Sequence, residues 1–338
     1  MLYPKGGIAF FDSGIGGLTT LSACVEYAKK KNLTPINYFY YGDNFRAPYG
    51  NLPEKQIFSY VEEIFSRFQA LDVSAVILAC NTVTAVCVEK LREEYSFPII
   101  GIEPAILPAM RDGGEVFVLA TCATCNSQKF QKLCRRAQAL YPSAKLQVFP
   151  CEGLAGEIEK NFGNKNVDYS KFLPRGNPSI VVLGCTHYIY IRKEIEAFFG
   201  CPAIDGNRAV AKRLFDVLSS SEQWSSVVKN TLIENAQKLP KNFQNFSKIE
   251  EKHFSGKEDQ RQTSFSNLKE RLSKVENREG KPLFLEIFSS TTLSQPLITP
   301  KNTLSQPPNY LTQPSRIFFL GDAKMVNKTK YEQMFAKK

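Results

Sequence analysis

Two cysteines stand at the ends of similar apolar segments. The run 76–79 leads into Cys80-Asn81-Thr82, and the run 181–184 leads into Cys185-Thr186-His187. A single cysteine after a strand is commonly a packed residue, but packing does not explain why polar residues follow both cysteines, because polar groups at strand ends need partners. If the two segments face each other, two thiols flank one small molecule from opposite sides. That geometry is what inversion of a carbon centre by proton exchange requires.

Each cysteine is predicted to lie where a strand passes into a helix. The residues before each cysteine are β-branched or leucine, and apolar residues recur at helical spacing over 82–95 and 188–199. A helix N-terminus carries partial positive charge and free N–H groups, so we expect it to lower the pKa of each thiol and to attract carboxylates. The polar residues after each cysteine are placed to cap these helices or to hold a substrate.

The elements that position these residues alternate along the chain. Strand signals between residues 7 and 218 fall at 8–11, 38–41, 73–79, 99–102, 116–120, 146–149, 180–183 and 202–204. Helical patterns lie between them, for example over 54–70 and 127–140. This alternation predicts an α/β fold in which helices cover parallel sheets, and ligands of such sheets bind beyond the carboxyl ends of the strands.

The composition is that of an ordinary globular chain. With 338 residues, 43% of them hydrophobic, the chain can bury a large core in about two domains. The absence of an apolar run of about 18 residues and of a signal-peptide pattern at the start predicts a cytoplasmic protein that does not enter a membrane. The net charge of +10 is dispersed over the sequence. Dispersed charge is typical of a solvated surface, so no nucleic-acid partner is expected.

The cysteines do not form a disulfide or zinc framework. There are nine of them, scattered along the chain, which is typical of reduced thiols. Cys122 and Cys125 form one Cys-x-x-Cys pair, but the second pair of ligands that a structural zinc site needs does not follow. We therefore expect no metal.

The segment 219–315 has a different composition from the rest. It is rich in polar residues and contains several late prolines, which predicts a flexible or loosely ordered insertion. A short helix at 268–272 and a strand at 282–288 are the candidate elements within it. A strand at 316–322 and a helix at 329–336 follow, so the tail is expected to complete a sheet.

These segments together resemble the glutamate racemases of the cofactor-independent aspartate/glutamate racemase family. The resemblance covers residue 7 to about 217 and resumes at Arg316, and it rests on the motifs at 11–18, 41–43, 48–50, 79–82, 101–105, 119–121 and 184–188. It implies two pseudo-symmetric doubly wound domains with the active site in the cleft between them. The first domain is expected to comprise residues 1–102, about 208–220 and 316–338, and the second residues 103–207, with 221–315 as the insertion.

The resemblance also implies an activity, the interconversion of L- and D-glutamate to supply D-glutamate for peptidoglycan. Cys80 would act on the D-isomer and Cys185 on the L-isomer, with Asp12 and His187 as their helpers and no cofactor. The family has a further catalytic carboxylate, which the resemblance places near Cys151. Counting along the chain from Cys151 we favour Glu159 over Glu152 for this role, although Glu159 also fits a solvated helix position.

The substrate contacts that the resemblance implies fall in the same motifs. They are Asp12, Ser13, Pro48, Tyr49, Gly50, Asn81, Thr82, Thr121, Thr124, Thr186 and His187.

Two alternatives stay open. Aspartate racemases share the paired cysteines, but those relatives typically carry Glu where His187 stands, so the sequence favours glutamate. A binding role toward a partner such as DNA gyrase, through the insertion, is the non-enzymatic alternative.

The chain is expected to form a homodimer. It departs from the family in this insertion and at Ile189-Tyr190, where Pro-Leu is typical.

Overall fold

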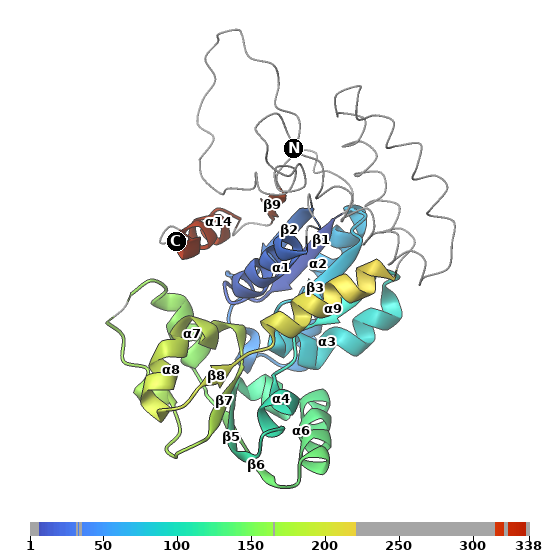
Figure 1. Cartoon of the computed structure of the whole chain (residues 1–338). Coiled ribbons are helices and arrows are strands. Elements are labelled where there is room, and N and C mark those ends of the chain that lie inside the picture. The colour runs from blue at the N-terminus through green and yellow to red at the C-terminus, as the bar shows by residue number, and fades with distance from the viewer. Residues whose placement is uncertain are drawn as a thin grey trace, which may run out of the picture. The chain divides into compact units, whose positions relative to one another are not determined.

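The structure is a computed structural model that describes residues 7–31, 33, 36–164, 166–220, 315–320 and 324–335 (Figure 1). The helix expected at 268–272, the strand expected at 282–288 and most of the insertion lie outside the described residues. All helices and strands named below belong to a single compact unit of the chain. Among the described residues, no helix is long and apolar enough to cross a membrane.

Five parallel strands form the first sheet, in the order β4-β3-β1-β2-β9. Their bounds are β1 Ile8–Asp12, β2 Asn37–Gly42, β3 Ala75–Leu78, β4 Ile99–Gly101 and β9 Arg316–Phe319. Every residue of the central strand β1 is buried, as expected when helices cover both faces of a parallel sheet. The last strand, β9, pairs with β2, which confirms that the tail of the chain returns to complete this sheet.

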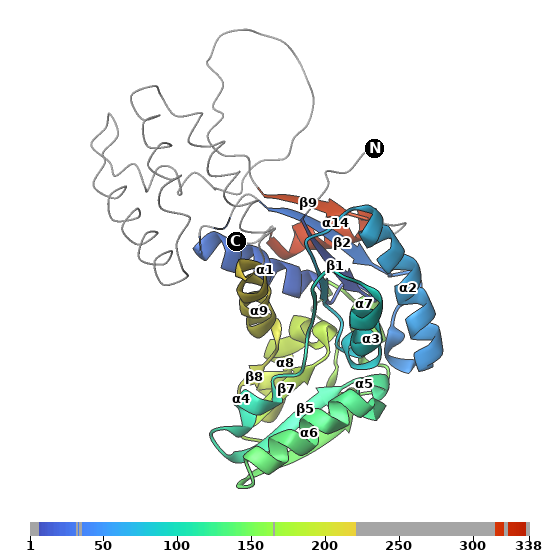
Figure 2. The ribbon, with the colours of Figure 1, turned by 90° about the vertical axis from the view of Figure 1, so that its right-hand side faces the viewer.

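Four parallel strands form the second sheet, in the order β6-β5-β7-β8. Figure 2 shows three of them, β5, β7 and β8. Their bounds are β5 Gly114–Ala120, β6 Ala144–Pro150, β7 Ile180–Gly184 and β8 Ala203–Ile204. The predicted α/β fold is therefore confirmed, with two sheets whose strand pairings are all parallel within the described residues.

Helices connect the strands. The α-helices are α1 Leu18–Lys30, α2 Glu54–Ala70, α3 Asn81–Glu94, α4 Ile106–Met110, α5 Cys122–Asn126, α6 Gln128–Leu140, α7 Leu154–Lys160, α8 Arg192–Phe199, α9 Asn207–Ser219 and α14 Lys324–Phe335. The 3₁₀ turns of the described residues are η1 Tyr49–Asn51, η2 Ser170–Phe172 and η3 Thr186–Ile191. The predicted helix 54–70 has the predicted bounds, and its apolar face is buried.

The single helix expected over 188–199 is wrong in its first part. The chain instead forms the 3₁₀ turn η3 after Cys185, and the α-helix α8 begins only at Arg192. All six residues of η3 are β-branched, aromatic or histidine, and such residues have low helix propensity because their χ1 freedom is lost against the preceding turn. The apolar spacing over this run reflects burial on several sides rather than an α-helix.

The connection from β1 to α1 is tight. The N–H of Gly17 donates to Asp12 Oδ2 over 2.5 Å. A Cβ atom on Gly17 would lie 2.7 Å from Cβ of Asp12 and 2.9 Å from Cβ of Ala79, closer than real Cβ atoms approach. The start of α1 therefore rests directly on the ends of β1 and β3.

We predict that Gly17→Ala lowers the free energy of unfolding by about 1–3 kcal/mol, because the added methyl group overpacks a buried backbone contact. Gly156→Ala is the matched control. Gly156 lies in α7, and its Cβ would meet only Pro48 at an ordinary 3.6 Å, so this change leaves stability equal or slightly higher. Urea unfolding followed by circular dichroism measures both. Equal stability of the two variants would contradict the tight connection.

Candidate active site

Cys80 lies in a buried polar cluster at the carboxyl end of the first sheet. It links β3 to α3, is 5% exposed, and its Sγ lies 3.5 Å from Oγ of Ser13. The start of α3 lowers the pKa of this thiol through the backbone of Val83, as expected, but this effect is outweighed. Burial raises the pKa of Cys80, the charge of Asp12 raises it further, and the hydrogen bonds from the backbone of Val83 and from Ser13 only partly oppose them.

Asp12, the last residue of β1, carries a carboxylate with one free oxygen. Its Oδ2 accepts from Gly17, whereas its buried Oδ1 has no hydrogen-bond partner among the described residues. Burial raises the pKa of Asp12, and the nearby positive charge of His187 opposes this shift. A buried acceptor without a donor is costly, so this oxygen is suited to a cation or an N–H group of a bound molecule.

Three threonines form a hydroxyl cluster beside Cys80. Thr82 Oγ1 lies 2.9 Å from Thr121 Oγ1 and 3.4 Å from Thr124 Oγ1, and the latter two hydroxyls lie 2.9 Å apart. Asn81 Nδ2 donates to the carbonyl of Ile102 over 3.4 Å.

Neither α3 nor η3 has a side-chain cap, so the capping alternative for the residues after each cysteine is wrong. Their side chains face other polar groups instead.

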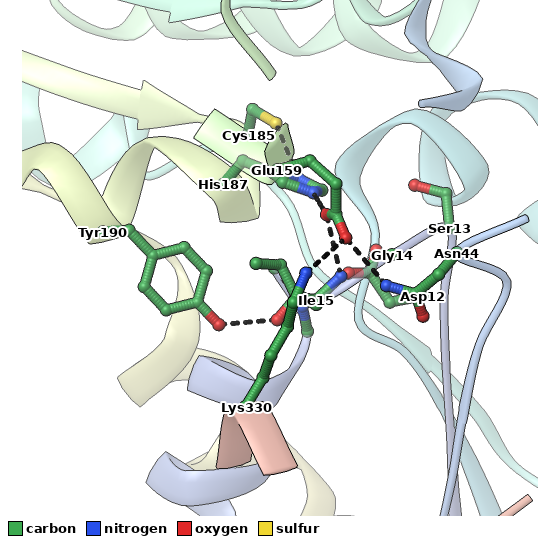
Figure 3. A network of polar contacts seen from close by, with 12 residues as sticks. Asp12, Ser13, Gly14, Ile15, Asn44, Glu159, Cys185, His187, Tyr190 and Lys330 are labelled. Atoms are coloured by element: carbon green, nitrogen blue, oxygen red, sulfur yellow. Dashed lines mark hydrogen bonds and ion pairs between the residues drawn. The ribbon is translucent and has the colours of Figure 1, made fainter. Parts of the chain in front are cut away.

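Cys185 begins a chain of three polar groups (Figure 3). Its Sγ lies 3.8 Å from Nδ1 of His187, and Nε2 of the same ring lies 2.6 Å from Oε2 of Glu159. Burial alone would lower the pKa of His187, but the contacts with Cys185 and Glu159 raise it well above its ordinary value. A protonated imidazole thus stands beside the second thiol, with a carboxylate behind it.

The predicted choice of Glu159 over Glu152 agrees with the geometry. Glu159 is held by four donors, whereas Glu152 is exposed. The donors to Oε2 are His187 and the N–H of Ile15 at 3.2 Å, and those to Oε1 are Asn44 at 2.7 Å and Lys330 at 3.2 Å. Burial would raise the pKa of Glu159, but the hydrogen bond from His187 and the neighbouring positive charges lower it to about 2. A solvated helix position is therefore excluded.

The remaining predicted contacts surround these clusters. Tyr49 is buried and donates through its OH to Asp43 Oδ2. Gly50 lies against Thr121, whose Cβ would be 2.8 Å from an added Cβ. Pro48 precedes η1 and packs near α7, while Thr186 is buried against the glycine loop 14–17.

That glycine loop brings the two cysteine clusters together. A Cβ on Gly16 would collide with the side chain of Thr186 and lie 2.9 Å from the N–H nitrogen of His187, so only glycine fits. The next residue back, Ile15, donates its N–H to Glu159. The charge of Cys185 is also among those that raise the pKa of Cys80. One short loop therefore contacts residues beside both thiols, because Gly17 lies against Asp12 and Ala79 while Gly16 lies against Thr186 and His187.

Sequence reasoning missed several residues of this site. Asp43 and Asn44 directly follow β2, so their position after a strand could have marked them as site residues. Lys330 and Tyr190 could not be found from the sequence, because their contacts are with distant segments. Lys330 on α14 contacts Glu159, and the OH of Tyr190 donates to the carbonyl of Ile15 over 2.6 Å. Among the described residues, no group of three or more His, Cys, Asp or Glu side chains is arranged to hold a metal ion.

Relatives of this chain are glutamate racemases. That of Leptospira borgpetersenii is 35% identical over 228 residues, which is 65% of this chain and 84% of the relative. That of Clostridium acetobutylicum is 34% identical over 242 residues, covering 67% and 91%.

Solved structures agree with the sequence relatives, and so does a family profile. The Escherichia coli glutamate racemase bound to L-glutamate and the activator UDP-MurNAc-ala is 27% identical, covers 65% of this chain and 84% of its own, and has a TM-score of 0.56. The Francisella tularensis enzyme in complex with D-glutamate is 27% identical, covers 63% and 81%, and has a TM-score of 0.52. The profile of the Asp/Glu/Hydantoin racemase family matches residues 17–214. The chain belongs to this racemase family.

Proposed function

We propose that this protein is a glutamate racemase that moves one proton between two cysteines on opposite sides of the substrate's α-carbon. The observation that supports the proposal is that two buried thiols follow strand ends, Cys80 beside Ser13 and Cys185 beside His187, and that the glycine loop 14–17 lies against Asp12 on one side and against Thr186 and His187 on the other. Relatives at about a third identity are glutamate racemases, and two neighbouring structures hold L- and D-glutamate. Glutamate is accordingly the proposed substrate.

The proton transfer balances without a redox step. Cys185 as thiolate removes the α-hydrogen of L-glutamate, and Cys80 as thiol delivers a proton to the opposite face of the carbanion, which gives D-glutamate. The reverse reaction starts with Cys80 as thiolate and Cys185 as thiol. The pair thus holds one proton in either resting form, and its titration belongs to both groups together.

Positive charge must be supplied to each thiolate because both cysteines are buried. At Cys185 the protonated His187 supplies it. At Cys80 the neighbouring Asp12 is negative, so the cation has to come from the substrate. Its ammonium group can pair with the free Oδ1 of Asp12, which offsets the charge that raises the pKa of Cys80.

The threonine cluster and the backbone N–H groups at the start of α3 are the proposed site for the α-carboxylate. Hydroxyl and N–H donors there stabilise negative charge that spreads from the α-carbon into the carboxylate in the transition state. Thr82, Thr121 and Thr124 are already within 2.9–3.4 Å of one another, so little reorganisation is needed.

The wider role is also part of the proposal. D-glutamate made by the protein would serve peptidoglycan synthesis, and the protein would act in the cytoplasm as a homodimer. Aspartate racemisation is the alternative activity within the family. Domain boundaries near residues 102, 207 and 220 stay predictions, as do the individual roles of the site residues.

Cys80→Ser and Cys185→Ser should each lower kcat for glutamate racemisation by at least about 1000-fold, because a hydroxyl is a far weaker acid than a thiol. Circular dichroism with L- and with D-glutamate measures the rates, in reducing buffer with a chelator. Cys201→Ser, at a partly exposed cysteine, is the matched control and should keep full activity. Faster turnover of aspartate than of glutamate by the unmodified protein would contradict the choice of substrate.

Glu159→Gln should lower kcat/KM by about 100-fold and move the alkaline limb of its pH profile to lower pH. The sign follows from the charge of Glu159, which raises the pKa of His187. Without that charge His187 loses its proton at lower pH, and the cation beside Cys185 disappears with it. Glu152→Gln, on an exposed side chain, is the control. An unmoved alkaline limb in Glu159→Gln would show that His187 is not the group being titrated.

Deleting residues 222–312 should leave racemisation within about three-fold, because all site residues named above lie outside this segment. Binding of DNA gyrase, measured by pull-down and by gyrase inhibition, should be lost in the deletion variant if the insertion carries the non-enzymatic role. A folded deletion variant without racemase activity would assign the insertion to the enzyme.

A further inference from the structure

The last helix of the chain reaches into the active site. Lys330 on α14 places Nζ 3.2 Å from Oε1 of Glu159, and both side chains are largely buried, with 19% and 15% exposure (Figure 3). This ion pair joins residues separated by 171 positions in the sequence. It is the one contact with Glu159 that comes from beyond the insertion, among the contacts of the described residues.

The face of α14 that carries Lys330 is firmly seated. Asn327 is fully buried and donates to the carbonyl of Gly42 over 3.2 Å, at the end of β2. One turn beyond Lys330, Met334 lies 3.5 Å from the OH of Tyr190. Residues three and four apart share a helix face, so these contacts fix the direction in which Lys330 points. Its ammonium group also lies 5.4 Å from the ring centre of Phe162.

The two cations beside Glu159 contact different oxygens of its carboxylate. His187 contacts Oε2, and Lys330 contacts Oε1. A carboxylate that is shared between two cations holds each of them less strongly than it would hold one alone, because each cation reduces the negative potential at the other. The other charged or titratable groups that face His187 are Cys185 and Asp12.

We propose that Lys330 is a positioning residue that orients the Glu159 carboxylate and shares its charge, and thereby sets how firmly Glu159 holds the proton on His187 beside Cys185. The proposal deepens the proposed function and rests on it. It makes the segment after the insertion part of the half of the site that acts on L-glutamate. Loss of the lysine leaves Asn44 as the remaining partner of Oε1 among the described residues, so the carboxylate no longer fixes the orientation of the His187 ring against Cys185 and proton transfer at Cys185 slows. Because the charge of Glu159 is then no longer shared with a second cation, His187 also holds its proton more tightly.

The test compares Lys330→Met with Lys328→Met, a lysine on the same helix that is 53% exposed and 3.9 Å from Glu332. We expect kcat/KM to fall about 10-fold in Lys330→Met, to stay within about two-fold in Lys328→Met, and to be largely restored in Lys330→Arg. The fall must be equal in both directions, because the two enantiomers have equal free energy. Lys330→Gln replaces the methionine variant if that variant does not fold.

Isotope effects distinguish positioning from mere stability. With α-deuterated substrates, Lys330→Met should show a larger isotope effect from L-glutamate, whose deuterium Cys185 removes, and a smaller one from D-glutamate, because the slow step has moved to Cys185. Rates equal to those of Lys328→Met, or a lower rate with both isotope effects unchanged, would overturn the proposal.

A second measurement does not depend on activity. The chain has two histidines, so ¹⁵N-histidine labelling in a His253→Gln background leaves the signal of His187 alone. The titration midpoint of His187 should rise in Lys330→Met and stay unchanged in Lys328→Met. An unchanged or lower midpoint in Lys330→Met would overturn the role of Lys330. Absence of glutamate racemisation in the unmodified protein would instead overturn the proposed function, and this titration would still decide the role of Lys330.

Discussion

A buried thiol ionises only when positive charge stands beside it, and the two cysteines of this site meet that requirement differently. Cys185 has the protonated ring of His187 next to it. Cys80 has the carboxylate of Asp12 as its neighbour, which together with burial keeps its proton in place. The resting site is thus asymmetric, with a cation at one sulfur and an anion near the other. A substrate that brings its own ammonium group removes much of this difference, which a reaction that runs in both directions needs.

The fold meets this requirement by placing the site residues at the carboxyl ends of parallel strands. Parallel strands deliver Asp12 and Cys80 to one edge of the first sheet, and β7 delivers Cys185 at the corresponding end of the second. The glycine loop 14–17, which follows β1, then contacts the residues around Cys185, since its backbone lies against Thr186, His187 and Glu159. A side chain at Gly14 or Gly16 would collide with Glu159, His187 or Thr186 and hold the two groups apart. The tightness of the β1–α1 connection is therefore a requirement of the site as much as of the core.

Much of this arrangement could be predicted from the sequence because it is encoded locally. Buried parallel strands are near-continuous apolar runs, so their ends mark Cys80 and Cys185, and family register placed Glu159. The pKa of Cys80 could not be foreseen from the helix N-terminus, because burial and Asp12 outweigh the helix and both depend on tertiary packing. Lys330 gave no local signal at all. Helical spacing misled at η3, where burial on several sides imitates one apolar face.

The central claim is that two different sulfurs handle the hydrogen on opposite faces of one carbon. It is tested most directly by racemising unlabelled L-glutamate in D₂O and analysing both enantiomers by mass spectrometry at early times. Two acids that exchange separately with solvent predict α-deuterium in the D-glutamate product, while the remaining L-glutamate stays unlabelled. Product that keeps the original α-hydrogen, or label that enters both enantiomers at equal rates, would contradict the account.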